Sequence, residues 1–231
     1  MKFIVEGEIF EKYPGVTIGV IVAEKLDNSG SPGEIAELLK SACANAKNTL
    51  ELESLSQEPR IQSWRRAYKL FGEDKDRASH EALIRRVLKG GEIPHINKLV
   101  DIYNLMSIKH VIPMGGEDLD KVQGDVRLKF SDGNESFLAI GSQVRSNPKK
   151  GEVIYADDKE VICSKWNWRE SDNIKFTEKT SRALLAFEGL PPFTEEKMRS
   201  ISSEFAGLIG KYCGGEIREQ LITASNREMQ I

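Results

Sequence analysis

The sequence lacks the long apolar runs of a membrane protein and the leader of a secreted one. No apolar stretch approaches the roughly 18 residues that a membrane-spanning helix requires, so an integral membrane protein is excluded. The first ten residues include Glu6 and Glu8, with no basic region followed by an apolar region. A secretory signal peptide would have both regions, so we expect the protein to act in the cytoplasm.

Residues that build disulfides, metal sites and cofactor sites are scarce. The three cysteines, Cys43, Cys163 and Cys213, are odd in number and include no CxxC pair, so a disulfide framework is not predicted. The three histidines lie 15 residues apart and form no i, i+4 metal pair. There is no glycine-rich dinucleotide or P-loop motif and no GxSxG nucleophile elbow. We therefore expect no cofactor and no bound metal.

Neither sign of charge dominates. The chain has 33 Lys and Arg against 36 Asp and Glu, a net charge of −3, so its overall field does not attract a polyanion. Contact with RNA would need a local basic patch. Arg77, Arg85 and Arg86 are the candidates, because they fall at helical spacing around a predicted helix that starts near Ser79. A solvated helix face is the alternative interpretation.

What is present indicates an α+β fold. The 231 residues are 39% hydrophobic, enough to close a core. Alternating or β-branched runs predict strands at 3–9, 16–23, 125–130, 136–140, 152–156, 160–164 and 217–223. Amphipathic patterns predict helices at 34–50, 61–71, 79–89, 95–109 and 194–212. Since helices do not regularly separate the strands, we expect a mostly antiparallel sheet with flanking helices. Residues 224–231 are predicted to be a frayed tail.

Two neighbouring segments carry candidate site residues. Asn97, Asp101 and Asn104 fall on one side of the predicted helix, where they form either the edge of a pocket or a solvated polar stripe. Further on, Gly115 and Gly116 place bare backbone next to carboxylates. Backbone can approach a ligand closely where side chains are missing, although a turn leading into a helix cap explains the pattern equally well.

A third candidate segment is aromatic. Trp166 and Trp168 flank Asn167, and Arg169 and Glu170 follow. If the preceding strand continues, the two tryptophans share one face. That face would make a platform for a base or an aromatic side chain. The alternative is a pair of core tryptophans beside a surface Arg–Glu pair.

Read in order, these segments resemble the B3/B4 domain of the bacterial-type phenylalanyl-tRNA synthetase β subunit, and more closely its free-standing B3/4 relatives. The strongest part reads NKLVDIYN over 97–104 and PMGGEDLDK over 113–121. The like segments of the synthetase read approximately N-x-L-V-D-x-T-N and P-L-H-A-F-D-L-D-K. The resemblance covers roughly residues 77–189. It implies a B3/B4-type fold with a central pocket, built as a core over 75–231 with an α/β extension over 1–74 packed on it.

The resemblance also implies an activity, because in the synthetase this domain edits mischarged tRNA by hydrolysing the tyrosyl ester. The transfer of individual residues is mixed. Asn104 matches the helix asparagine, Tyr103 replaces a threonine, and Gly115 replaces the pocket histidine. Gly116 and Glu117 replace an Ala-Phe pair. Glu170 falls near the glutamate that senses the tyrosine hydroxyl. The fold therefore carries over, and the specificity for tyrosine does not.

An aminoacyl ester is already activated, so an editing hydrolase needs orientation and oxyanion donors more than a protein nucleophile. On that basis the catalytic candidates are Asn104, Gly115, Gly116 and Glu117. The substrate-binding candidates are Asn97, Asp101, Tyr103, Trp166, Asn167, Trp168, Arg169 and Glu170.

Three functions follow from these assignments. The first is a trans-editing hydrolase that deacylates mischarged aminoacyl-tRNA, with the aminoacylated 3′ end as its partner. The second is a non-catalytic module that binds RNA or a free amino acid in the same pocket. The third is an interaction protein that docks on a synthetase. The sequence names neither the amino acid nor the oligomeric state.

Overall fold

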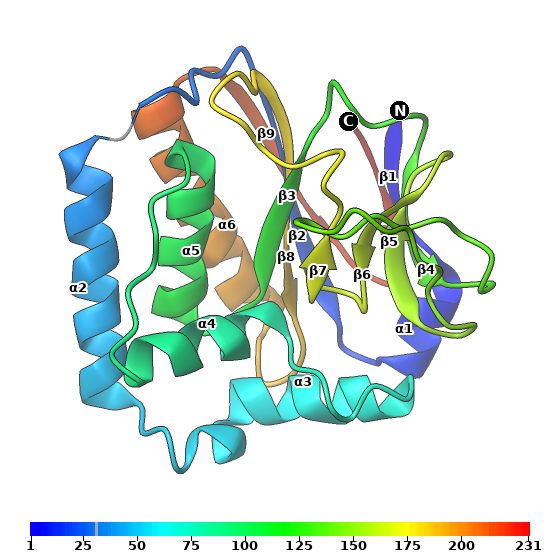
Figure 1. Ribbon diagram of the computed structural model, residues 1–231, viewed down its shortest axis with the longest axis horizontal. Coiled ribbons are helices and arrows are strands. Elements are labelled where there is room, and N and C mark those ends of the chain that lie inside the picture. The colour runs from blue at the N-terminus through cyan, green and yellow to red at the C-terminus, as the bar shows by residue number, and fades with distance from the viewer. Residues whose placement is uncertain (31) are drawn as a thin grey trace.

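The computed structural model describes residues 1–30 and 32–231, and it arranges them as two β-sheets, with most of the helices on the side of the four-stranded sheet and one short helix beside the six-stranded sheet (Figure 1). Along the described residues, no helix is both long enough and apolar enough to cross a membrane. The layers run from the six-stranded sheet, through the four-stranded sheet, to α5 (Lys98–His110) and α6 (Glu195–Cys213), with α2 (Gly33–Thr49) outermost. The α+β class is confirmed.

The first sheet has six strands and contains both ends of the chain. Its order is β10 (Glu228–Gln230), β1 (Lys2–Val5), β4 (Val126–Phe130), β5 (Val153–Ala156), β6 (Val161–Ser164) and β7 (Arg169–Glu170). Every pair is antiparallel except β1 with β4, which run parallel. The predicted frayed tail is therefore wrong: Met229 is buried opposite Phe3, because apolar side chains there complete the sheet.

The second sheet is wholly antiparallel. Its order is β3 (Met114–Asp118), β8 (Arg182–Gly189), β2 (Thr17–Glu24) and β9 (Glu216–Ile222). The β-branched run of β2 is buried along almost its whole length. Residues of one parity, such as Val20, face the core between the sheets, and those of the other, such as Ile21, face α5 and α6.

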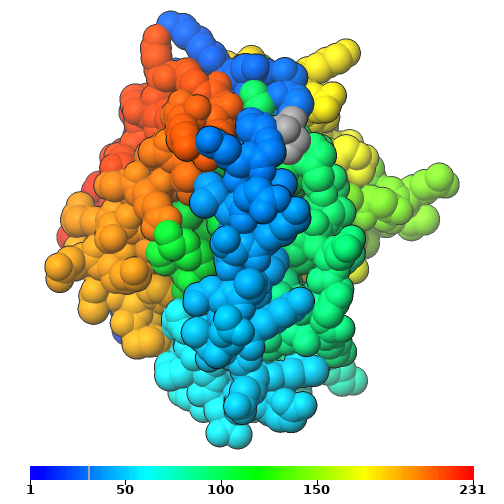
Figure 2. Space-filling view, turned by 90° about the vertical axis from the view of Figure 1, so that its left-hand side faces the viewer, coloured from blue at the N-terminus to red at the C-terminus, as the bar shows by residue number. Residues whose placement is uncertain are grey.

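Six α-helices and one short turn complete the described fold. They are α1 (Gly7–Lys12), α2 (Gly33–Thr49), the 3₁₀ turn Leu55–Gln57, α3 (Pro59–Leu70), α4 (Ser79–Leu88), α5 (Lys98–His110) and α6 (Glu195–Cys213). Seen from the α2 side, α2 runs down the outer surface, and α3 covers the bottom (Figure 2). Thr194 caps α6 by accepting a hydrogen bond from the Lys197 N–H.

Three predicted elements differ from the structure. Residues 3–9 do not continue as a strand, because α1 begins at Gly7. The expected strand at 136–140 forms only isolated bridges, at Phe137 and Ala139. The alternative of a turn leading into a helix cap at Gly115 and Gly116 is wrong, because both glycines lie inside β3, which continues to Asp118.

The predicted division at residues 74–75 stays a prediction. The structure shows that β1 and β2, both within 1–74, pair on each side with strands from 75–231. Residues 1–74 thus contribute strands to both sheets.

Candidate functional site

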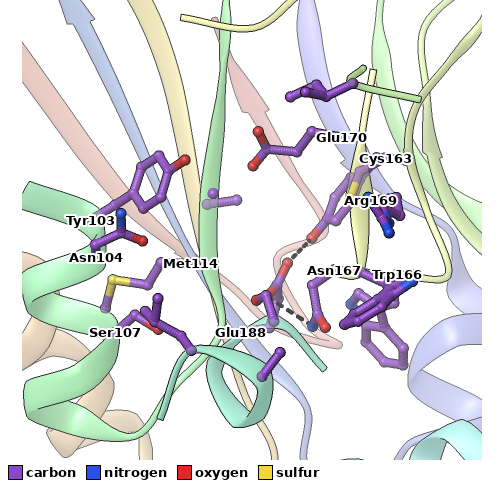
Figure 3. Close-up of a pocket in the computed structure, with 18 of the residues that line it drawn as sticks. Tyr103, Asn104, Ser107, Met114, Cys163, Trp166, Asn167, Arg169, Glu170 and Glu188 are labelled. Atoms are coloured by element: carbon purple, nitrogen blue, oxygen red, sulfur yellow. Dashed lines mark hydrogen bonds between the residues drawn. The ribbon is translucent and has the colours of Figure 1, made fainter. Parts of the chain in front are cut away.

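A cavity of about 450 Å³ opens where α4, α5, the edge strand β3 and the β6–β7 turn meet (Figure 3). Its volume is within the range of small-molecule sites. Ten of the residues predicted for the site line it: Arg86, Tyr103, Asn104, Gly115, Glu117, Trp166, Asn167, Trp168, Arg169 and Glu170. Residues far apart in sequence therefore meet around one cavity.

Asn97 and Asp101 lie at the start of α5 and do not line this cavity. Asn97 is the N-cap, and its Oδ1 accepts a hydrogen bond from the Val100 N–H at 3.1 Å. The Asp101 carboxylate accepts from the Ile96 N–H and pairs with His95 Nδ1. Both side chains thus fix where α5 begins. In this structure they position the helix that carries Tyr103 and Asn104.

Of the three arginines predicted to bind RNA, only Arg86 reaches the cavity, at its exposed rim. Arg77 and Arg85 surround the buried carboxylate of Glu81, together with Arg65. Burial opposes ionisation of Glu81, but the hydrogen bonds from Arg65 and Arg85 hold its pKa below the usual value. RNA contact by these arginines stays a prediction.

The edge position of β3 decides which of its backbone groups are available. The Glu188 N–H donates to the Pro113 carbonyl at one end of the β3–β8 ladder. By antiparallel alternation, the Gly115 N–H then points into the ladder and the Gly116 N–H points away from it. Asp118, of the same parity as Gly116, donates its N–H outside the ladder, to Ile174. Gly116 is therefore the glycine with an outward N–H.

Each of the two glycines lets a different group lie close to the β3 backbone. A Cβ on Gly115 would lie 2.7 Å from Glu170 Oε1, so the missing side chain lets this carboxyl lie against β3. A Cβ on Gly116 would meet the Leu184 carbonyl oxygen at 2.6 Å and the Phe176 ring at 2.7 Å, away from the cavity.

Three carboxyl groups line the cavity, from three different strands: Glu117 on β3, Glu170 on β7 and Glu188 on β8. Withdrawal from water raises the pKa of Glu170 and of Glu188 to about 7. The same burial, together with the neighbouring carboxyls of Glu170 and Glu188, raises the pKa of Glu117 well above its usual value. The cavity interior is therefore acidic and poorly solvated.

Glu188 was missed by the sequence interpretation, together with its whole strand. It is 3% exposed, and its carboxyl accepts hydrogen bonds from the Tyr155 hydroxyl at 2.7 Å and the Asn167 amide at 3.4 Å (Figure 3). A lone acid in the otherwise apolar run ALLAFEG was the available signal, because an acid is seldom buried without a functional or structural reason.

A strained turn between β6 and β7 holds Asn167 in place. Lys165 and Trp166 both adopt left-handed backbone conformations, with φ of 51° and 65°, which is unusual for residues other than glycine. The Tyr68 hydroxyl contacts the Lys165 carbonyl at 2.8 Å and Asn167 Oδ1 at 3.0 Å. The surrounding structure thus fixes a strained turn beside the cavity, a common position for such strain in functional sites.

The two tryptophans do not form the expected platform, because the strand ends at Ser164. The Trp166 ring is fully buried against Tyr13 and Trp64, with centroid distances of 4.7 Å and 4.9 Å. Trp168 stays half-buried at the rim, with the Arg169 guanidinium 5.4 Å from its ring centroid. Only Trp168 and Arg169 remain accessible for stacking.

Comparison with known protein families identifies the fold that carries this cavity. The family model described as the B3/4 domain matches residues 63–208. The chain belongs to the B3/4 domain family. The resemblance predicted for 77–189 is thereby confirmed, and the match begins before residue 75, inside the predicted extension.

Relatives of this B3/4 domain include two curated β subunits of phenylalanine–tRNA ligase. That of Fusobacterium nucleatum is 27% identical over 150 residues, covering 55% of this chain and 18% of the relative. That of Mycoplasmoides gallisepticum is 32% identical over 77 residues, covering 33% of this chain and 10% of the relative. The chain thus spans less than a fifth of the curated relatives that it matches.

Among solved structures, an N-terminal fragment of the phenylalanyl-tRNA synthetase β subunit from Pyrococcus horikoshii is similar. The two chains are 12% identical, and the match covers 93% of this chain and 49% of the fragment, with a TM-score of 0.47.

Proposed function

We propose that this B3/4 domain hydrolyses the ester bond of mischarged aminoacyl-tRNA in trans, in the cytoplasm. The observation that carries the proposal is the composition of the cavity. It places three carboxyls and the Asn104 amide around one space large enough for an aminoacyl group, and the Gly116 N–H donates to Glu170, one of these carboxyls. The similarity to phenylalanine–tRNA ligase β subunits supports the same assignment.

The reaction needs an activated ester, a positioned water and a donor for the developing oxyanion. The water oxygen bonds to the ester carbonyl carbon, the bond from that carbon to the ribose oxygen breaks, and the ribose oxygen takes up a proton. We assign the water to the Asn104 amide, which has no hydrogen-bond partner among the described residues and lines the cavity. The vicinal ribose hydroxyl helps to orient that water.

The remaining groups place the substrate. The Gly116 N–H donates to the Glu170 carboxyl in the ligand-free protein, and we assign it to the ester oxygen, as charge develops there, once Glu170 has engaged the substrate. The Glu170 carboxylate receives the α-ammonium group. At the rim, the half-buried Trp168 ring and the exposed Arg169 and Arg86 guanidinium groups contact the terminal adenosine and its phosphate.

The test is a deacylation panel. The purified protein is mixed with tRNAs carrying correct and incorrect amino acids, and loss of the ester is followed against a protein-free control. We expect rapid loss from one or a few mischarged pairs. Asn104→Ala should slow that loss by about 10²-fold or more, in the range of removing a positioned polar group. Asn45→Ala, at an exposed asparagine on α2, is the matched control and should change nothing.

No acceleration with any pair, from protein shown to be folded, would contradict the proposal and favour the non-catalytic alternative. Two observations favour that alternative. A glycine, Gly115, stands where the resemblance places the pocket histidine of the synthetase, and burial raises the pKa of the Cys163 thiol, which keeps it protonated. Tight binding of a free amino acid without turnover would then assign the cavity to recognition. Co-purification with a synthetase would indicate the docking role.

A further inference from the structure

The Glu117 carboxyl is the cavity acid without a hydrogen-bond or ion-pair partner among the described residues. Its side chain lines the cavity while the residue is only 7% exposed. Across the described ranges 1–30 and 32–231, no group donates a hydrogen bond to it and no basic side chain pairs with it. A buried carboxyl without partners is destabilising for the protein alone. A ligand that brings a partner would remove this cost.

The other two carboxyls have few partners of their own. Glu188 receives the Tyr155 hydroxyl and the Asn167 amide, and Glu170 receives the Gly116 N–H. All these donors are neutral. The basic side chains that line the cavity, Arg86 and Arg169, are exposed at its rim. The interior therefore holds three acids and, in the part of the chain that the structure describes, no base.

The three carboxyls come from three different strands, which favours an extended ligand. No group of three His, Cys, Asp or Glu side chains among the described residues is arranged to hold a metal ion, so one small cation cannot serve all three. The groups still interact, since the charges of Glu170 and Glu188 act on Glu117. A ligand with two separated cationic groups matches this arrangement better than one with a single ammonium.

We propose that the cavity selects aminoacyl groups with a basic side chain, in which the α-ammonium meets Glu170 and the side-chain cation meets Glu117, with Glu188 beside it. This inference deepens the proposed function and rests on it for the aminoacyl-tRNA ester. The apolar surfaces of Met114 and Ala186 would contact the methylene chain between the two charges. An uncharged side chain of equal length would leave the Glu117 carboxyl unpaired.

The test compares L-lysinamide with L-norleucinamide, which differ by the terminal amino group. Isothermal titration calorimetry at pH 7 gives the dissociation constant of each for the full chain. We expect lysinamide, and also argininamide, to bind at least tenfold more tightly than norleucinamide. Equal affinities, or a preference for norleucinamide or tyrosinamide, would overturn the inference.

Two variants identify the residue responsible. Glu117→Gln keeps the size of the side chain and removes its charge, so it should reduce the preference for lysinamide to within threefold while norleucinamide binding is retained. That retained binding also shows that the variant is folded. Glu178→Gln, at an exposed glutamate away from the cavity, should keep the full preference. An unchanged preference in Glu117→Gln would refute the role of this carboxyl.

The deacylation panel separates this inference from the proposed function. Hydrolysis confined to tRNAs with uncharged amino acids would refute the inference and leave the editing activity standing. Tight, Glu117-dependent binding of lysinamide without hydrolysis of any ester would support the inference and refute the editing activity.

Discussion

Replacing Glu188 with glutamine isolates the energetic effect of one carboxyl in the cavity. Glutamine has nearly the same shape, and its amide oxygen can accept the hydrogen bond from Tyr155 that Glu188 Oε1 accepts at 2.7 Å. The substitution therefore removes the ionisation and keeps most of the packing. Because Glu188 is buried to 3% exposure, solvent screens its charge very little.

The magnitude follows from the pKa. Burial raises the pKa of Glu188 from 4.5 to about 7, and each pKa unit corresponds to about 1.4 kcal/mol. Between these two values the folded protein holds a proton that the unfolded chain has released. The free energy of unfolding therefore falls as the pH rises through this window. Above pH 7 the carboxyl has reduced the stability by about 3 kcal/mol relative to pH 4.5.

The assay is urea denaturation of the wild type and Glu188→Gln at pH 5 and pH 8, followed by circular dichroism. Other groups titrate in both proteins, so the difference between the two isolates Glu188. We expect similar stabilities at pH 5 and a variant more stable by about 3 kcal/mol at pH 8. Glu178→Gln should show no such pH-dependent difference. A Glu188→Gln variant that is less stable at pH 8, or offset equally at both values, would refute the reasoning.

Three further results are expected. Tyr68→Phe removes the hydroxyl that contacts two oxygens of the β6–β7 turn, so the free energy of unfolding should fall by about 1–3 kcal/mol and lysinamide binding should weaken, both measurable by denaturation and calorimetry. Asn97→Ala removes the cap on the Val100 N–H and should cost about 1 kcal/mol, with the preference for lysinamide unchanged. Lysinamide affinity should rise by about tenfold from pH 5.5 to pH 7, because Glu170, with a pKa of about 7, must ionise to bind the α-ammonium group; a flat profile in calorimetry would contradict this.

Few other groups in the cavity could change charge between pH 5.5 and pH 7 and so affect the pH profile of binding. Burial raises the pKa values of the Tyr103 and Tyr155 hydroxyls and the Cys163 thiol, so these groups stay neutral. Within the part of the chain that the structure describes, the carboxyls are therefore the cavity groups that change charge between pH 5.5 and 7.

Local signals in the sequence predicted elements where side-chain pattern and backbone preference agree. The β-branched run before Ala23 predicted β2, and Thr194 predicted the start of α6. The pattern failed where long-range pairing decides the structure. β10 is only three residues long and mostly exposed, so its order comes from pairing with β1 at the other end of the chain. No local pattern could have predicted that contact.

The cavity was predictable in part, for a similar reason. The resemblance covered α5 and β3, so Asn104, Gly115 and Glu117 were found together. The direction of each β3 group depends on the β3–β8 register, and the sequence interpretation had no β8. It therefore treated both glycine amides as equivalent donors and missed Glu188. Trp166 was misplaced because two consecutive left-handed residues, Lys165 and Trp166, turn the chain where a continuing strand was assumed.

The strain and the acidity of the cavity have one physical interpretation. A left-handed backbone at a residue other than glycine, or an unpaired buried carboxyl, persists only when the rest of the fold compensates for it. Here both occur around the same space, on the β6–β7 turn and on Glu117. A purely structural cavity would be more stable with an apolar side chain at 117 and a glycine at 165. The arrangement is explained if a cationic ligand neutralises the carboxyls, because the groups that destabilise the empty protein then become the groups that bind.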